Sequence, residues 1–321
     1  MRAVLLCVVV KRLDAVVMDG DETVEFESRS VESYRALLAG VRQLPPVRVR
    51  GVLRQPQGTG PHPLVIVGVG SQGLASGREE LYGAALLAQG IAVLIVDSFG
   101  SRGFGETVSN QALLSFPAQT ADVLFALERM SKDARIDAGR IGFLGFSRAG
   151  QIAVFIDDER LHQAVIGGGA RYAAFAAMYS GCNPQWRNPQ PTGKPMLIYL
   201  GGADTLAPAE KCQRYAERLR QAGGDVRTIV LPEAHHSFDS LQPATRHDNV
   251  LVLAGCELRV EDDGVIVEDK SGLRSQSDWA SFLKEAEAAC GCRGATTGHG
   301  PHPRDIAVND VVAFFKAALR A

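Results

Sequence analysis

The amino-acid sequence predicts an α/β fold, with a mostly parallel sheet covered by helices on both faces. Between residues 64 and 231, short apolar runs alternate with amphipathic segments of helical length. The runs are apolar throughout, which is typical of parallel strands buried on both sides. A length of 321 residues suits one large α/β domain with insertions, and a hydrophobic content of 46% is enough for a sizeable core.

Residues 1–46 form an N-terminal extension in this interpretation. The apolar run 3–10 follows Arg2 and resembles the core of a short signal peptide, although Lys11 and Arg12 come directly after it. A strand, or a misplaced start, is the alternative. Further on, residues 14–30 and 47–54 predict edge strands, and residues 31–41 predict a helix that ends before Pro45 and Pro46.

The remainder of the chain, residues 47–321, carries the alternating elements. Buried strands are expected at 64–69, 91–96, 141–146, 164–167, 195–200 and 226–231, and helices at 78–89, 119–130, 151–156 and 209–222. The alternation stops at 240–305, which we interpret as an insertion. It contains a predicted β-hairpin over 258–267, turning at Asp262-Asp263-Gly264, and a last helix follows at 307–319.

The segment 140–153 holds the strongest functional signal. An apolar strand ends in the turn Gly145-Phe-Ser147-Arg-Ala149-Gly150, and a helix begins directly after it. A strand, a tight turn and a helix with Ser at the apex form a nucleophile elbow, in which small residues flank the turn. Ser147 is therefore the candidate nucleophile, with Ala149 in place of the usual second Gly.

A Ser hydroxyl needs a base near neutral pH, and that base needs an orienting carboxylate. Asp204 follows the strand at 195–200, and His236 follows the strand at 226–231. Both therefore lie past the carboxyl ends of parallel strands, where α/β sheets place their ligands. The chain order Ser, Asp, His also fits this fold. Asp204 as a simple turn residue, and His235 as the base, remain alternatives.

The developing oxyanion of an ester needs N–H donors. The expected donors are the backbone N–H groups of Arg148, which opens the elbow helix, and of Ser71, in the loop after the strand at 64–69. The spacing Gly68-x-Gly70-x-x-Gly73 also fits a dinucleotide fingerprint, but the ordered triad favours the oxyanion interpretation.

The net charge and the composition limit the classes of binding partner that the sequence supports. A net charge of −2 gives no electrostatic case for nucleic acid or an anionic membrane, and no apolar run reaches the length of a spanning helix. No cofactor and no metal are expected, since His299 and His302 lie in a Gly/Pro loop without an acidic or Cys partner. The expected partner is a small-molecule ester, and the oligomeric state cannot be read from the sequence.

The six cysteines carry information about the compartment. None forms a C-x-x-C pair. We expect crosslinks Cys182–Cys212 and Cys256–Cys290, which leave Cys7 and Cys292 free; buried free thiols are the alternative. Disulfides favour a periplasmic or secreted location over the cytoplasm, and residues 1–14 would then be the remnant of an export signal.

From about Val47 to its C-terminus the chain resembles the α/β-hydrolases of the dienelactone hydrolase type. The resemblance depends on the segments 68–73, 97–103, 145–150, 179–183, 204–208 and 234–239. It implies an α/β-hydrolase fold with Ser147, Asp204 and His236 as the triad. Dienelactone hydrolases themselves use Cys where this chain has Ser147, which favours a general carboxylic ester hydrolase.

The predicted function is therefore cofactor-independent cleavage of carboxylic esters or lactones through an acyl-enzyme. A peptidase or acyltransferase with the same triad, or a non-catalytic binding protein on this fold, are the alternatives. Arg102, Arg148 and Arg171 are candidates for holding a substrate carboxylate, or for structural pairing with loop carbonyls and acids. The natural substrate and its acyl length cannot be derived from the sequence.

Overall fold

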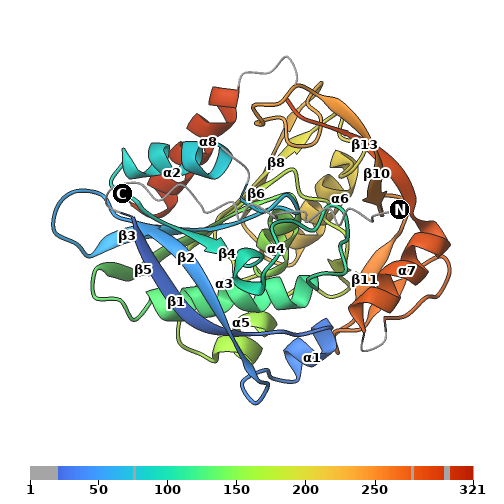
Figure 1. The fold of residues 1–321 in the computed structure, drawn as a ribbon, viewed down its shortest axis with the longest axis horizontal. Coiled ribbons are helices and arrows are strands. Elements are labelled where there is room, and N and C mark those ends of the chain that lie inside the picture. The colour runs from blue at the N-terminus through green and yellow to red at the C-terminus, as the bar shows by residue number, and fades with distance from the viewer. Residues whose placement is uncertain (1–20, 75–76, 276–277, 300–303, 321) are drawn as a thin grey trace, which may run out of the picture.

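The computed structural model describes residues 21–74, 77–275, 278–299 and 304–320, and its centre is an eight-stranded sheet (Figure 1). The strand order is β1-β2-β4-β3-β5-β6-β8-β9. β2 is antiparallel to β1 and β4, and the six strands from β4 to β9 are parallel. The predicted mostly parallel sheet is confirmed. Its strands are β1 (Glu22–Arg29), β2 (Pro46–Arg54), β3 (His62–Gly68), β4 (Ala92–Asp97), β5 (Ile136–Phe146), β6 (Ala174–Met178), β8 (Met196–Gly201) and β9 (Val226–Leu231).

Helices cover both faces of the sheet, because successive side chains of each buried strand point to opposite sides. In β3, Leu64 and Ile66 pack in the apolar cluster that holds α3 and α4, whereas Val65 and Val67 pack in the cluster that holds α2 and α8. The helices are α1 (Tyr34–Leu38), α2 (Arg78–Leu87), α3 (Phe116–Met130), α4 (Arg148–Phe155), α5 (Glu159–Ile166), α6 (Ala209–Gln221), α7 (Trp279–Cys290) and α8 (Arg304–Ala318).

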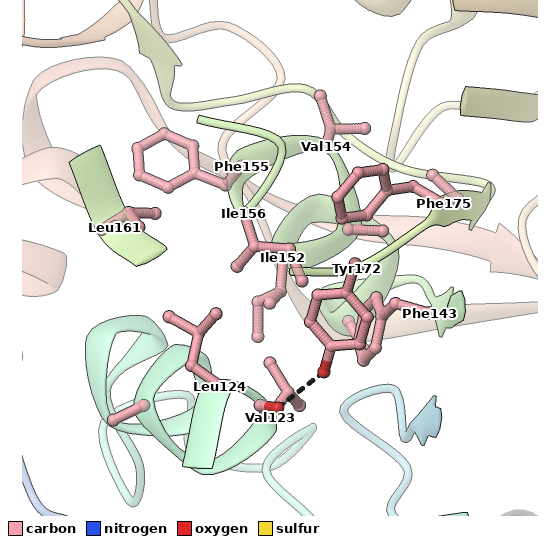
Figure 2. Close-up of a cluster of buried hydrophobic side chains, with 14 of the residues drawn as sticks. Val123, Leu124, Phe143, Ile152, Val154, Phe155, Ile156, Leu161, Tyr172 and Phe175 are labelled. Atoms are coloured by element: carbon pink, nitrogen blue, oxygen red, sulfur yellow. Dashed lines mark hydrogen bonds between the residues drawn. The ribbon is translucent and has the colours of Figure 1, made fainter. Parts of the chain in front are cut away.

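Helix α4, which begins one residue after Ser147, is buried along its whole length. Figure 2 shows Ile152 and Phe155 of α4 among side chains from α3, α5 and β6. At the edge of this cluster the Tyr172 hydroxyl donates a 2.6 Å hydrogen bond to the Val123 carbonyl. Packing on several sides fixes the helix, and with it the turn that carries Ser147.

The prediction of a strand at 164–167 is wrong. These residues end helix α5, whose N-cap Asp158 accepts a hydrogen bond from the backbone N–H of Arg160. Leu161 and Val165, four residues apart, are both buried, which is the period of a helix. Gly167 ends the helix at φ 70°, and the strand of this unit follows as β6.

The residues before position 47 contribute to the main sheet. β1 pairs with β2 from Glu22 opposite Leu53 to Arg29 opposite Pro46. The helix expected at 31–41 is shorter, because α1 begins after its N-cap Ser33 and ends at Leu38. The signal-like run 3–10, Cys7 and His302 lie outside the described residues.

The insertion, residues 240–305, adds strands and one helix beside the main sheet (Figure 1). β10 (Thr245–Val252) pairs antiparallel with β13 (Cys292–Thr297). β11 (Leu258–Val260) and β12 (Ile266–Glu268) form the expected hairpin, and β11 also pairs with the short β7 (Gln185–Trp186). Buried side chains of β11, β12 and α7 belong to the same apolar cluster as α3 and α4. The described part of the insertion therefore packs onto the core of the main domain.

Two cysteine pairs lie at disulfide distance, Cys182–Cys212 and Cys256–Cys290, each with its Cα atoms 5.0 Å apart. These are the pairs expected from the sequence. Cys292 is a free, exposed thiol. Within the described ranges, no helix is both long and apolar enough to cross a membrane.

Candidate active site

Ser147 lies at the turn between β5 and α4, with φ 52° and ψ −110°. A non-glycine residue at positive φ is strained, and such strain persists only where the surrounding structure imposes it. A Cβ on Gly145 would lie 2.0 Å from the Ala149 carbonyl oxygen, and one on Gly150 would lie 2.7 Å from that of Met178. The glycines therefore allow the close chain approach that raises Ser147 above the sheet.

The structure brings Ser147, His236 and Asp204 together from three strand ends. Ser147 Oγ lies 2.7 Å from His236 Nε2, and His236 Nδ1 lies 2.7 Å from Asp204 Oδ2. A carboxylate can only accept from Nδ1–H, so Nε2 is left as the acceptor for the Ser hydroxyl. Asp204 Oδ1 accepts from the backbone N–H groups of Leu206 and Ala207 at 2.9 and 2.8 Å, which fixes the carboxylate. Asp204 and His236 are each 4% exposed.

His235, the alternative base, points elsewhere. Its Nδ1 lies 3.1 Å from the Ala203 carbonyl oxygen. The neighbouring His236 is the histidine in contact with Ser147.

The loop after β3 passes directly beside Ser147. A Cβ on Gly70 would lie 3.3 Å from the Ser147 Cβ. The loop is held by hydrogen bonds from Gly73 N–H to the Gly70 carbonyl and from Thr107 N–H to the Ser71 carbonyl, at 2.9 and 2.7 Å. Arg148 is the first residue of α4, so its N–H has no acceptor within the helix. Ser71, Ser147 and Arg148 all line one cavity.

Two of the three arginines proposed from the sequence lie away from that cavity, which corrects the expectation. The Arg102 guanidinium forms a two-pronged ion pair with buried Asp122, at 2.8 and 2.9 Å. Arg171 pairs with Glu159 and with the carbonyls of Gly167 and Ala170. Both guanidinium groups are therefore engaged in pairing with acids or loop carbonyls, the structural alternative for these arginines.

Arg148 does line the cavity and is 3% exposed. Its guanidinium donates to three neutral oxygens, Gln119 Oε1 at 2.7 Å, Gln111 Oε1 at 2.8 Å and the Leu114 carbonyl, and it lies 4.1 Å from the centre of the Phe116 ring. Within the described residues no carboxylate pairs with it. Burial lowers the pKa of Arg148 to about 9, since water is excluded from its charge.

A second polar network lies beside His236. Its residues were not among the candidates predicted from the sequence. The Tyr179 ring packs edge-on against the His236 imidazole, with 5.0 Å between centres. Buried Asp239 accepts from the hydroxyls of Tyr179 and Tyr82 at 2.9 and 3.0 Å. Burial raises the pKa of Asp239, against the nearby Arg78 charge and the two hydroxyl donors. The signal in the sequence that could have identified this network is Asp239, an acid three residues after His236.

The cavity above Ser147 has a volume of about 270 Å³. The main domain contributes polar groups to its lining, including Ser71, Gln111 and Asn183. The insertion contributes mostly apolar side chains: Val250, Leu251, Leu253, Leu258, Trp279, Phe282 and Leu283. In the described part of the chain, no group of three or more His, Cys, Asp or Glu side chains is arranged to hold a metal ion.

Part of the chain is similar in sequence to curated acylamino-acid-releasing enzymes. The chain is 27% identical to acylamino-acid-releasing enzyme 2 of Oryza sativa subsp. japonica over 203 residues, which is 49% of this chain and 25% of that protein. It is 22% identical to the acylamino-acid-releasing enzyme of Homo sapiens over 198 residues, 50% of this chain and 26% of that protein. The chain thus spans about a quarter of the length of these curated relatives.

Among solved structures, the apo form of Thermogutta terrifontis esterase 2 is 17% identical with a TM-score of 0.48, covering 66% of this chain and 85% of its own. An α/β-hydrolase from a Medee basin deep-sea metagenome is 16% identical with a TM-score of 0.47, covering 68% and 87%. A model of the dienelactone hydrolase family matches residues 49–252, more than half of the chain. The chain therefore belongs to the dienelactone hydrolase family.

Proposed function

We propose that the protein is a serine hydrolase that cleaves carboxylic esters through an acyl-enzyme. The observation that carries the proposal is the chain of two 2.7 Å contacts from Asp204 through His236 to Ser147, at the floor of a cavity. A hydroxyl next to a base that is itself oriented by a carboxylate is the arrangement that nucleophilic acyl transfer needs.

In the proposed reaction Ser147 Oγ attacks the acyl carbon while its proton passes to His236 Nε2. The carbonyl oxygen becomes an oxyanion, which the N–H groups of Arg148 and Ser71 stabilise. His236 then returns the proton to the leaving alcohol as the acyl–oxygen bond breaks, and the acyl group stays on Ser147. Water then attacks the acyl carbon while its proton passes to His236. The bond from the acyl carbon to Ser147 Oγ breaks, His236 returns the proton to Ser147 Oγ, and the acid leaves. Asp204 orients the imidazole throughout.

We propose a second, smaller contribution from the Arg148 side chain. It is a buried cation at the cavity wall with no carboxylate partner in the described chain. An acyl group that carries its own carboxylate would supply one, so anionic esters should gain a modest advantage.

Peptide cleavage is the second candidate function, because the curated relatives are acylamino-acid-releasing enzymes. The two are separated by comparing p-nitrophenyl esters with acetyl-aminoacyl p-nitroanilides on the same preparation. A fluorophosphonate should label the protein at Ser147, as peptide mapping would show. Hydrolysis of the anilides with no activity on the esters would favour the peptidase, and no labelling with no turnover would leave a binding protein.

We also propose a location outside the reducing cytosol. The cysteine pairs Cys182–Cys212 and Cys256–Cys290 persist as disulfides only under oxidising conditions. Intact-mass measurement after alkylation without reductant is the test. Modification of Cys182, Cys212, Cys256 or Cys290 in natively oxidised protein would contradict the proposal.

A further inference from the structure

Two separate parts of the insertion contribute residues to the lining of the cavity, helix α7 and the β10–β13 pair. Figure 1 labels α7, β10 and β13. α7 contributes Trp279, Phe282 and Leu283, all buried and apolar. β10 and β13 contribute a mixed surface that includes His247 and Thr297. The two parts therefore offer different chemistry to a bound substrate.

Helix α7 lies on the side of the cavity where the oxyanion donors are. Trp279 Nε1 donates to the Gln111 carbonyl at 3.2 Å, and the Trp279 ring lies 5.4 Å from that of Phe116. The Gln111 side chain in turn donates to Ser71 Oγ at 3.0 Å and accepts from Arg148 at 2.8 Å. A continuous set of contacts thus connects α7 with Ser71 and Arg148.

The β10–β13 pair lies on the side of the base. Thr297 of β13 forms a parallel bridge with His236, and the N–H of Gly298 donates to the His236 carbonyl at 2.7 Å. The imidazole that would protonate a leaving group is therefore next to β13.

The proposed reaction determines which part of an ester lies on each side of the cavity. The leaving alcohol must come within hydrogen-bond reach of His236 Nε2 to receive its proton, so it occupies the β13 side. The carbonyl oxygen, the leaving alcohol and the acyl chain point in different directions from the acyl carbon. With the alcohol on the β13 side, the acyl chain extends away from His236, into the part of the cavity that α7 lines. Resting on the proposed function, we propose that α7 is the acyl-binding wall of the site and that it sets the length of acyl chain that the enzyme accepts.

The anchoring of α7 supports a wall of fixed position. At its start, Trp279 donates to the Gln111 carbonyl of the main domain at 3.2 Å and packs against the Phe116 ring. At its end, Cys290 is paired with buried Cys256. A wall held at both ends sets the length of acyl chain that fits, because it cannot retreat without breaking these contacts.

The experiment compares two series of esters on the intact protein. One series varies the acyl group, with p-nitrophenyl acetate, butyrate, octanoate and decanoate. The other keeps acetate and varies the alcohol from ethyl to hexyl. Phe282→Ala enlarges the proposed acyl site, and Phe282→Leu is a milder change for use if the first variant does not fold. Ile306→Ala, at a side chain 46% exposed on α8, is the matched control.

Phe282→Ala should raise kcat/KM for decanoate relative to butyrate by at least about tenfold, the scale of one or more methylene contacts in an apolar pocket. Its alcohol series should match that of the parent and of Ile306→Ala. A change in alcohol preference with an unchanged acyl profile would overturn the assignment of α7, although Ser147 would still be labelled by a fluorophosphonate. No labelling and no ester turnover in the parent would instead overturn the proposed function, and this assignment with it.

Discussion

The strand-end loops and the insertion meet across one cavity but are built in different ways. The loops place Ser147, Asp204 and His236 through short polar contacts, and each follows a strand of the main sheet. The insertion faces them with apolar side chains and is crosslinked within itself by Cys256–Cys290. It is attached to the main domain by a shared apolar cluster and by a few polar side chains.

One of those side chains is Asn183, whose amide donates to the carbonyls of Leu253 and Cys256 and accepts from the N–H of Leu258. Another is Lys211, which donates to the Cys256 carbonyl and pairs with Glu257 at 3.2 Å. Asn183 and Lys211 directly follow and precede the cysteines of the other disulfide, Cys182–Cys212. The comparison teaches that the positions of the proposed reacting groups depend on the sheet, whereas the shape of the cavity above them depends on how the insertion is attached.

Removing a group from the strand-end loops should have the largest effect. We expect Ser147→Ala and His236→Ala each to lower kcat by at least about 10⁴-fold, because the nucleophile and its base act as one unit. Thermal unfolding should be nearly unchanged in Ser147→Ala, whose small side chain does not fill the core. His235→Ala is the control and should keep most of the activity. Activity in His236→Ala with inactivity in His235→Ala would show that the base is misassigned.

Removing the disulfide of the insertion should change stability more than chemistry. Cys256→Ser with Cys290→Ser opens a crosslink between residues 34 positions apart, worth roughly 3–4 kcal/mol by the chain-entropy estimate. We expect a lower midpoint in urea and a broader acyl-length profile, with acetate hydrolysis largely kept. Cys292→Ser, at the exposed free thiol, is the matched control. An unchanged urea midpoint in the double variant would contradict the role of this crosslink.

Acid should weaken the insertion through Glu268. Burial acts to raise the pKa of this carboxyl, but donors from the backbone of Glu257, Lys270 and Ser271 and from the Ser271 hydroxyl outweigh it and lower the pKa from 4.5 to about 2. A lowered pKa means that the stabilisation is present above about pH 4.5 and is lost as the pH falls toward 2.

Glu268→Gln should therefore destabilise the protein at pH 7 by about 1.5–3 kcal/mol, the range for hydrogen bonds to a charged group. The variant should also lose less stability than the parent between pH 4.5 and 2. Urea unfolding at several pH values measures both. Parallel acid profiles for the two proteins would contradict the proposed role.

The smallest expected effect concerns the Arg148 side chain. The p-nitrophenyl monoester of glutaric acid should be hydrolysed with a kcat/KM up to about tenfold above that of p-nitrophenyl pentanoate, the gain from one charge-assisted hydrogen bond to an already engaged donor. Arg148→Met should erase that preference, whereas Arg102→Met, away from the cavity, should keep it wherever the variant folds. Equal rates for both esters in the parent would remove the proposed contact.

The approach of Ser147, Asp204 and His236 could be predicted because the carboxyl ends of parallel strands meet at one edge. The helix at 159–166 was expected as a strand because the apolar run 164–167 alone has no period that separates strand from helix; the helical spacing appears only when Leu161 is included. Arg102 was misplaced for a different reason. Its partner Asp122 lies on a helix 20 residues further on, and only the folded chain shows that their charges are paired. The cavity wall of α7 likewise depends on packing between distant segments.

The insertion leaves the main domain and returns to it at neighbouring points. Pro243 and His299 form a parallel bridge, and the chain then continues into α8, which packs on α2. When the two ends of an inserted segment are already adjacent, its length adds little to the cost of loop closure. Evolution or an engineer could therefore exchange the residues between these ends for another segment while His236 and α8 keep their places. The exchanged segment would change which substrates fit the cavity, while the proposed catalytic residues in the strand-end loops would stay the same.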